Sequence, residues 1–179
     1  AQKYTVIHRE QVKDFNIRLP KDMEYEIGID QSTSCTGIYL QDTKDTINIL
    51  LELEFANPDK KSYFRELFLL LRKLVIDIKV NLIVCEKPVP NMKQAYTHKV
   101  LVALFGKLES FLEMEPSLQD SDLESIYPQV WKSKIIDKSK GKGRINSKVC
   151  TAEDLCDKKP LLRNYLIISP AKDLDGFDA

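Results

Sequence analysis

The sequence predicts an α/β fold in which a mixed five-stranded sheet, with its first three strands antiparallel, is flanked by helices. Three observations carry this prediction. Residues 24–30 (EYEIGID) alternate between apolar and polar side chains, as a half-buried strand does. Residues 61–78 repeat apolar side chains at helical spacing. Residues 81–86 (NLIVCE) form the short apolar run expected of a buried strand reached by a helical crossover. Together these patterns indicate a mixed sheet with helices packed against it.

The first part of the chain predicts an extension followed by three strands. Residues 1–23 are charged and weakly periodic, and we expect an N-terminal extension whose role is unclear. The domain proper is expected to span residues 24–179. Its first strand ends at Asp30, and the polar turn QSTSCT leads to a second strand, GIYLQ. TINILLELEF predicts a third strand, and the short turns between these strands make an antiparallel meander.

The second part of the chain predicts helices alternating with strands. After the helix over 61–78 and the strand ending in Glu86, a second amphipathic helix is expected over 93–114, ended by Pro116. Residues 125–127 predict a short fifth strand, and Pro128 a helix that carries Trp131. A helix over 147–157 follows, and Ser169-Pro170 are suited to begin a last helix that is cut short at Ala179.

Composition excludes several classes of protein. With 43% hydrophobic and 30% charged residues, the chain contains no apolar run near the roughly 20 residues that a membrane span needs. No secretory signal is evident, so we expect a cytoplasmic protein, or a nuclear or organellar one in a eukaryote, that is not secreted. The four scattered cysteines lack C-x-x-C spacing, which favours reduced thiols over a zinc site or a disulfide framework.

Charge points to a local, not a global, surface for nucleic acid. The formal net charge is zero, whereas DNA-binding proteins usually carry an overall basic excess. Residues 132–148 are nevertheless strongly basic and oppose a single acid, Asp137. Such a segment, which contains two glycines, is either a DNA-binding loop or simply a solvated one. Its cationic residues are Lys132, Lys134, Lys138, Lys140, Lys142, Arg144 and Lys148.

Two acids stand at the ends of predicted central strands. Asp30 ends EYEIGID and Glu86 ends NLIVCE. An unpaired buried carboxylate costs several kcal/mol, so acids in such positions normally have a cation, an arginine or a metal ion as partner. Asp30 and Glu86 are therefore candidate metal ligands.

A second pair of acids lies near the end of the chain. Asp175 and Asp178 in DGFDA are three residues apart, which places both carboxylates on one face of a helix. Like charges on one face repel, and a hard dication between them removes the repulsion. Asp173 is an alternative member of this pair. The two histidines, His8 and His98, do not adjoin a serine or cysteine that suggests a catalytic triad, so metal-activated water is the more natural nucleophile.

These residues resemble the RuvC-like Holliday junction resolvases of the RNase H-like superfamily. GIDQSTSCTG is similar to the family's first motif, LIVCEKP to its second, YPQVWK with the basic stretch to its Pro and Lys/Arg segment, and DGFDA to its final DxxDA. The four motifs occur in order over residues 24–179. Two departures are Ser32, where many relatives have glycine, and the end of the chain at Ala179.

The resemblance implies an RNase H-like fold and a crossover junction endodeoxyribonuclease that acts in DNA recombination and repair. Two Mg²⁺ ions, for which Mn²⁺ can substitute, would be held by Asp30, Glu86, Asp175 and Asp178. Carboxylate oxygens suit Mg²⁺, and a pair of such ions promotes phosphodiester hydrolysis. The implied partners are branched DNA and a second copy of the chain, with no membrane and no nucleotide cofactor. Apolar residues of the 93–114 helix fit either a dimer face or a core-facing stripe, and Tyr96 and Phe105 either stack on an unpaired base or are structural.

Other functions remain open at this stage. GIDQSTSCTG also resembles the first phosphate loop of sugar kinases and actin-like ATPases, although 179 residues do not supply the second domain of those enzymes. A binding module that has lost catalysis is a further alternative. So is a nuclease of the same chemistry that acts on RNA–DNA hybrids or on other branched DNA.

Overall fold

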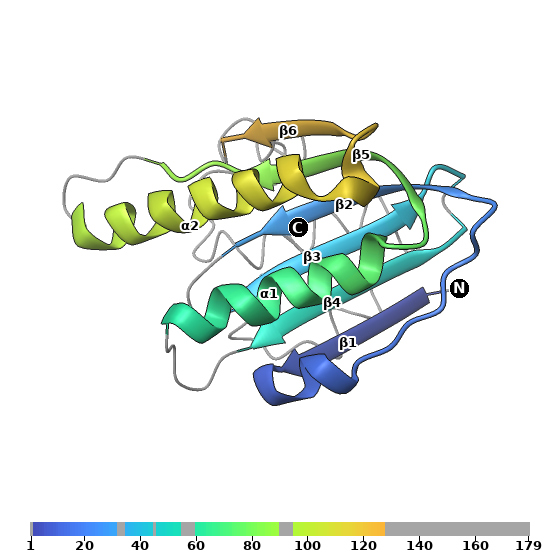
Figure 1. Cartoon of the computed structure of the whole chain (residues 1–179), viewed down its shortest axis with the longest axis horizontal. Helices are drawn as coiled ribbons and strands as arrows, with labels where there is room; N and C mark the ends of the chain where they lie inside the picture. Colours follow the sequence, from blue (N-terminus) through green and yellow to red (C-terminus); the bar gives the residue numbers. More distant parts are fainter. Residues whose placement is uncertain (1, 32–34, 45, 55–59, 90–94, 128–179) are drawn as a thin grey trace, which may run out of the picture.

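The computed structural model describes residues 2–31, 35–44, 46–54, 60–89 and 95–127. These residues form a mixed six-stranded sheet with two α-helices and two short 3-10 helices (Figure 1). The strands are β1 (Gln2–His8), β2 (Glu24–Asp30), β3 (Cys35–Asp42), β4 (Asn48–Glu54), β5 (Lys79–Glu86) and β6 (Asp122–Ile126). The helices are η1 (Arg9–Asp14), α1 (Lys60–Val75), α2 (Ala95–Met114) and η3 (Pro116–Leu118). The predicted α/β class is confirmed.

The sheet has the order β1-β4-β3-β2-β5-β6. Strands β2, β3 and β4 form the predicted antiparallel meander, and β5 and β6 continue it parallel to β2. The predicted number of five strands is wrong, because β1 pairs parallel with β4 and adds a sixth at the edge.

Residues near the N-terminus, which the sequence assigned to an extension, contribute to the core. Ile7 of β1 is 2% exposed and Val12 of η1 is fully buried. Lys73 of α1 donates hydrogen bonds from Nζ to the carbonyl oxygens of Val12 (2.9 Å), Lys13 (2.6 Å) and Phe15 (3.2 Å). A charged donor is well suited to carbonyl oxygens that gather at the end of a short helix. The N-terminal segment is therefore joined to both the sheet and α1.

Helices α1 and α2 lie side by side over one face of the sheet (Figure 1). The alternation in β2 shows which side chains meet them, since Tyr25, Ile27 and Ile29 are buried and belong to one apolar cluster with residues of both helices. The helices contribute Leu67, Leu70, Leu71, Leu74, Leu104, Leu108 and Leu112. Fully burying one such side chain stabilises a fold by roughly 1.5–3 kcal/mol. The apolar stripe of α2 thus faces the core, as one of the two interpretations of the 93–114 helix predicted.

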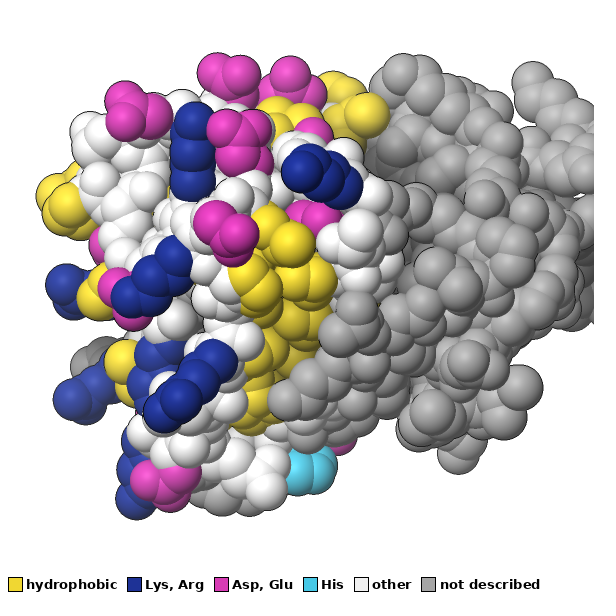
Figure 2. Space-filling model, turned by 90° about the vertical axis from the view of Figure 1, so that its right-hand side faces the viewer, with side chains coloured by type: hydrophobic (Ala, Val, Ile, Leu, Met, Phe, Trp, Pro, Cys, Tyr) yellow, Lys and Arg dark blue, Asp and Glu magenta, His cyan; other side chains and the backbone are white. Residues whose placement is uncertain are grey.

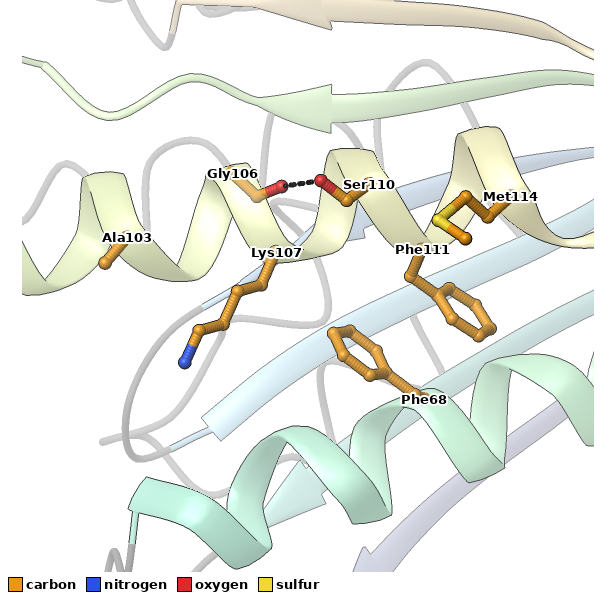
Figure 3. A pocket seen from close by; sticks show the side chains of 7 residues that line it. All are labelled: Phe68, Ala103, Gly106, Lys107, Ser110, Phe111 and Met114. Carbon is orange, nitrogen blue, oxygen red and sulfur yellow. Dashed lines mark hydrogen bonds between the residues drawn. The ribbon is translucent and has the colours of Figure 1, made fainter.

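The outer side of this layer carries a shallow groove between α1 and α2 (Figure 3). The Phe68 and Phe111 rings are parallel there, with centroids 4.7 Å apart, and Ser110 Oγ donates to the Gly106 carbonyl oxygen at 3.0 Å. Ala103, Lys107 and Met114 complete the lining. The residues that line this groove include no acid or histidine, so it offers no catalytic set.

Two further predictions concern the whole chain. Among the described residues, Cys35 and Cys85 are buried and are not joined by a disulfide, whereas Cys150 and Cys156 lie outside them. Among the described helices, none is long and apolar enough to cross a membrane. The elements predicted after residue 127 also lie outside the described residues, including those around Trp131, over 147–157 and at Ser169-Pro170.

Candidate active site

Asp30 and Glu86 are the last residues of neighbouring parallel strands. Ile29 of β2 pairs with Cys85 of β5, so the next residue of each strand, Asp30 and Glu86, ends its strand at the same level of the sheet. Adjacent strands are about 4.8 Å apart, and residues in register project from the same face. The fold therefore brings together the two acids that the sequence singled out.

The two carboxylates project from the face opposite α1 and α2. Ile29 and Cys85 are 2% and 4% exposed and belong to the core beneath the helices. Because side chains alternate along a strand, Asp30 and Glu86 belong to the other face, and both are half-buried. Two acids in this position can share a cation and remain accessible to a substrate.

A third acid, which no sequence pattern singled out, lies in the same row of the sheet. Asp30 pairs with Gly37 of β3, and Gly37 pairs with Glu52 of β4. Glu52 is 0% exposed. Gly37 contributes no side chain between the two acids, whose backbones are two strand spacings apart, about 10 Å. An acid flanked by leucines in the run LLELEF was the signal that could have identified it.

Gln31 links the two strand ends. Its Nε2 donates a 2.8 Å hydrogen bond to the main-chain oxygen of Glu86. Gln31 is 8% exposed, and its Oε1 is buried without a hydrogen-bond partner among the described residues. Gln31 is thus tied to β5 through its Nε2, while its Oε1 is an acceptor without a partner among the described residues.

A cation and an aromatic ring adjoin the same strand ends. Lys87 follows Glu86, and its backbone N–H donates to the Ile126 oxygen of β6 at 2.8 Å. Its Nζ lies 5.2 Å from the centroid of the Tyr127 ring, within the range of a cation–π contact. Tyr127 is 40% exposed. The positive charge of Lys87 and the accessible ring of Tyr127 therefore lie one residue beyond the ends of β5 and β6.

Cys85 is not a candidate nucleophile despite its place beside Glu86. Burial raises the pKa of its thiol to about 12, and the negative charge of Glu109 adds to the effect. A thiol with so high a pKa stays protonated at neutral pH, whereas reactive cysteines are thiolates. The two histidines lie on elements other than β5, which carries Cys85. His8, at the end of β1, has its Nδ1 3.8 Å from Glu54 Oε2, and His98 lies in α2.

Most of the other predicted site residues lie outside the described residues. These are the acids Asp175 and Asp178, the alternative Asp173, and the basic set Lys132, Lys134, Lys138, Lys140, Lys142, Arg144 and Lys148. In the described part, no group of three or more His, Cys, Asp or Glu side chains is close enough to hold a metal ion. On the face shown in Figure 2, basic and acidic side chains are interspersed around a strip of hydrophobic ones.

The chain was compared with protein-family models, with curated proteins and with solved structures, and none of them matches it.

Proposed function

We propose that this protein is a Mg²⁺-dependent, structure-selective endonuclease of the RuvC-like type that resolves four-way DNA junctions as a homodimer. The observation that carries the proposal is that Asp30 and Glu86, each one residue beyond the paired Ile29 and Cys85, end adjacent parallel strands. Two carboxylates at neighbouring strand ends are suited to bind a hard divalent cation.

The arrangement of the sheet supports the same proposal. Without β1, the order is β4-β3-β2-β5-β6, an antiparallel meander that continues with two parallel strands. This is the mixed five-stranded arrangement expected of an RNase H-like fold from the resemblance. Fold alone does not decide function, so the acids carry more weight than the strand order.

The donor set fits magnesium. Asp30 and Glu86, joined by Asp175 and Asp178, would hold two Mg²⁺ ions, with Mn²⁺ able to replace them. Bound there, the ions would supply Lewis acidity and an activated water for phosphodiester hydrolysis. The protein's own residues hold the carboxylates in register, because both belong to strands anchored in the core.

DNA would approach the carboxyl ends of β2 and β5. Lys87 and the basic segment, from Lys132 to Lys148, would contact backbone phosphates, which position DNA without reading its sequence. Resolution of a junction needs two symmetric cuts, and a homodimer with a two-fold axis supplies two such sites. A role in DNA recombination and repair, in the cytoplasm or in a nucleus or organelle, follows from this activity.

A second candidate keeps the chemistry and changes the substrate to RNA–DNA hybrids or other branched DNA. The same acid pair favours it equally, since junction recognition depends on shape and dimer geometry. A phosphotransfer fragment of the sugar kinase or actin type has less support, because the described sheet carries acids at both strand ends and the phosphate-loop resemblance is confined to one hairpin.

Cleavage assays test the proposal. A mobile four-way junction, a linear duplex, a flap and an RNA–DNA hybrid are incubated with the protein in Mg²⁺, in Mn²⁺ and in EDTA. We expect the junction to be cut fastest and EDTA to stop cutting. Cutting the junction no faster than the duplex would overturn resolution, and a preference for hybrid or flap would select the second candidate. ATP or ADP binding measured by calorimetry would instead favour the phosphotransfer alternative.

A further inference from the structure

Gln31 has a feature that neither the fold nor the acid pair explains. The residue follows Asp30 and is 8% exposed, and its Oε1 is buried without a hydrogen-bond partner among the described residues. A buried acceptor left unsatisfied destabilises the folded state. Native proteins place water, an ion or a donor against such atoms, so the oxygen points to a ligand.

The orientation of this amide is fixed by its neighbour. Gln31 Nε2 donates to the Glu86 main-chain oxygen at 2.8 Å. Exchanging the nitrogen and oxygen would bring two acceptors together with no hydrogen between them. The unsatisfied atom is therefore the oxygen, and it is held beside the ends of β2 and β5.

The chemistry of an amide oxygen limits the kinds of ligand that Gln31 can bind. Asp30 precedes Gln31 in the chain, and Glu86 provides the carbonyl that anchors it. An amide oxygen held where two acid-ending strands finish is suited to a positively charged or hydrogen-bond-donating ligand. Hard divalent cations bind carboxylate, amide carbonyl and water oxygens together.

We propose that Gln31 is a further oxygen ligand of the cation site at Asp30 and Glu86, with Oε1 contacting a divalent cation directly or through one of its waters. The inference rests on the proposed function for the presence of that cation. In this proposal Gln31 has two roles: Nε2 ties the residue after β2 to the end of β5, and Oε1 contacts the ion. Groups that orient or supplement metal ligands typically change metal affinity 10- to 100-fold when they are removed.

Binding of Mn²⁺ to the full chain, followed by electron paramagnetic resonance without DNA, tests this role independently of cleavage. Gln31→Leu should weaken Mn²⁺ binding about tenfold or more. Gln31→Glu places an anionic oxygen at the same position and should tighten binding. Gln41→Leu is the matched control, since Gln41 is a half-buried strand glutamine that donates to Glu26 at 3.2 Å towards the other end of the sheet. The control should bind Mn²⁺ as the wild type does.

The outcomes separate this inference from the proposed function. If Asp30→Asn loses Mn²⁺ binding while Gln31→Leu and Gln31→Glu both bind as the wild type does, the role of Gln31 is overturned and the acid site stands. If the wild type binds no Mn²⁺, both proposals fail. Should Gln31→Leu not fold, as judged by circular dichroism, Gln31→Glu decides: affinity equal to or below that of the wild type overturns the inference.

Discussion

Acids lie at the amino end of β2, where β3 ends, and also at the carboxyl ends of β2 and β5, and the arrangement of these two groups differs. At the amino ends, Glu24 accepts hydrogen bonds from Lys79 Nζ at 2.8 Å and from Asn81 Nδ2 at 2.7 Å. Asp42, which pairs with Tyr25, accepts from the backbone N–H groups of Thr46 and Ile47, both at 2.7 Å, and from Thr46 Oγ1 at 2.6 Å. These acids have the partners that a structural role requires.

At the carboxyl ends, two acids occupy adjacent positions on one face. Asp30 and Glu86 are neighbours in register, and Gln31 beside them has a buried oxygen without a partner among the described residues. Acids placed side by side repel unless a cation lies between them. The two groups thus differ in arrangement: acids at the amino end of β2 accept hydrogen bonds from Lys79, Asn81 and Thr46, whereas at the carboxyl ends two acids occupy one face.

The largest effect is expected from removing the charge of an acid at the carboxyl ends. Asp30→Asn and Glu86→Gln should each lower the Mg²⁺-dependent cleavage rate by at least about 100-fold, because a metal ion contributes several kcal/mol and about 1.4 kcal/mol corresponds to tenfold. Junction binding should remain. Glu24→Gln is the control at the amino end and should cleave normally. Full activity in either carboxyl-end variant would refute the metal-site assignment.

The next effect is on stability and concerns Glu52. This fully buried acid shares the row of Asp30 but lies two strands away, with Gly37 between them. Glu52→Ala should lower the free energy of unfolding by roughly 2–4 kcal/mol. The substitution leaves a cavity in the core, and it removes the interactions that the buried carboxylate makes. Chemical denaturation measures this loss.

A matched variant tests whether Glu52 is a structural acid or a part of the proposed cation site. Glu52→Gln keeps the size of the side chain and removes its charge. It should bind Mn²⁺ within about twofold of the wild type, because ligand removal typically changes affinity 10-fold or more. A weakening as large as that of Asp30→Asn would instead make Glu52 part of the cation site.

A smaller, pH-dependent effect is expected at Asp42. Desolvation raises the pKa of this buried carboxyl, but hydrogen bonds from Thr46 and Ile47 outweigh it and hold the pKa below its usual value. Because the folded pKa is the lower one, the stabilisation is complete above the unfolded pKa of about 3.9 and is lost as the pH falls through the folded pKa.

Asp42→Asn tests this sign. It should lower the free energy of unfolding by about 1–3 kcal/mol at pH 7, and the difference from the wild type should shrink towards pH 2. Denaturant titrations at several pH values measure it, with the exposed Asp14→Asn as a control. A difference that grows on acidification would contradict the assignment of these hydrogen bonds.

Short sequence patterns predicted the elements that form because of their own residues. Alternation identified the strand that ends at Asp30, and an apolar run identified the strand that ends at Glu86. Both acids were predicted as site residues because strand ends are visible in sequence. Their proximity was only expected, since it depends on the parallel pairing of β2 with β5 across more than 50 residues.

Features that depend on distant pairing were not predictable in the same way. Strand β1 was missed because its role depends on β4, with which Gln2 to His8 pair in parallel. Glu52 was part of the third predicted strand and was not singled out, whereas it is fully buried in the row of Asp30. Gln31 was assigned to a polar turn, and its link to the Glu86 oxygen appears only in three dimensions.

The smallest effect is expected at the exposed pair Glu24 and Lys79. Hydrogen bonds from Lys79 and Asn81 lower the pKa of Glu24, and the bond to Glu24 raises the pKa of Lys79, so both partners indicate the same interaction. Their side chains are 46% and 64% exposed, where ion pairs contribute little and salt screens them. Glu24→Gln should therefore lower the melting temperature by a few degrees at most, and the difference should vanish in about 1 M NaCl. A loss of melting temperature that does not depend on salt would contradict an exposed ion pair. A loss of the proposed cleavage activity would contradict a purely structural role for Glu24.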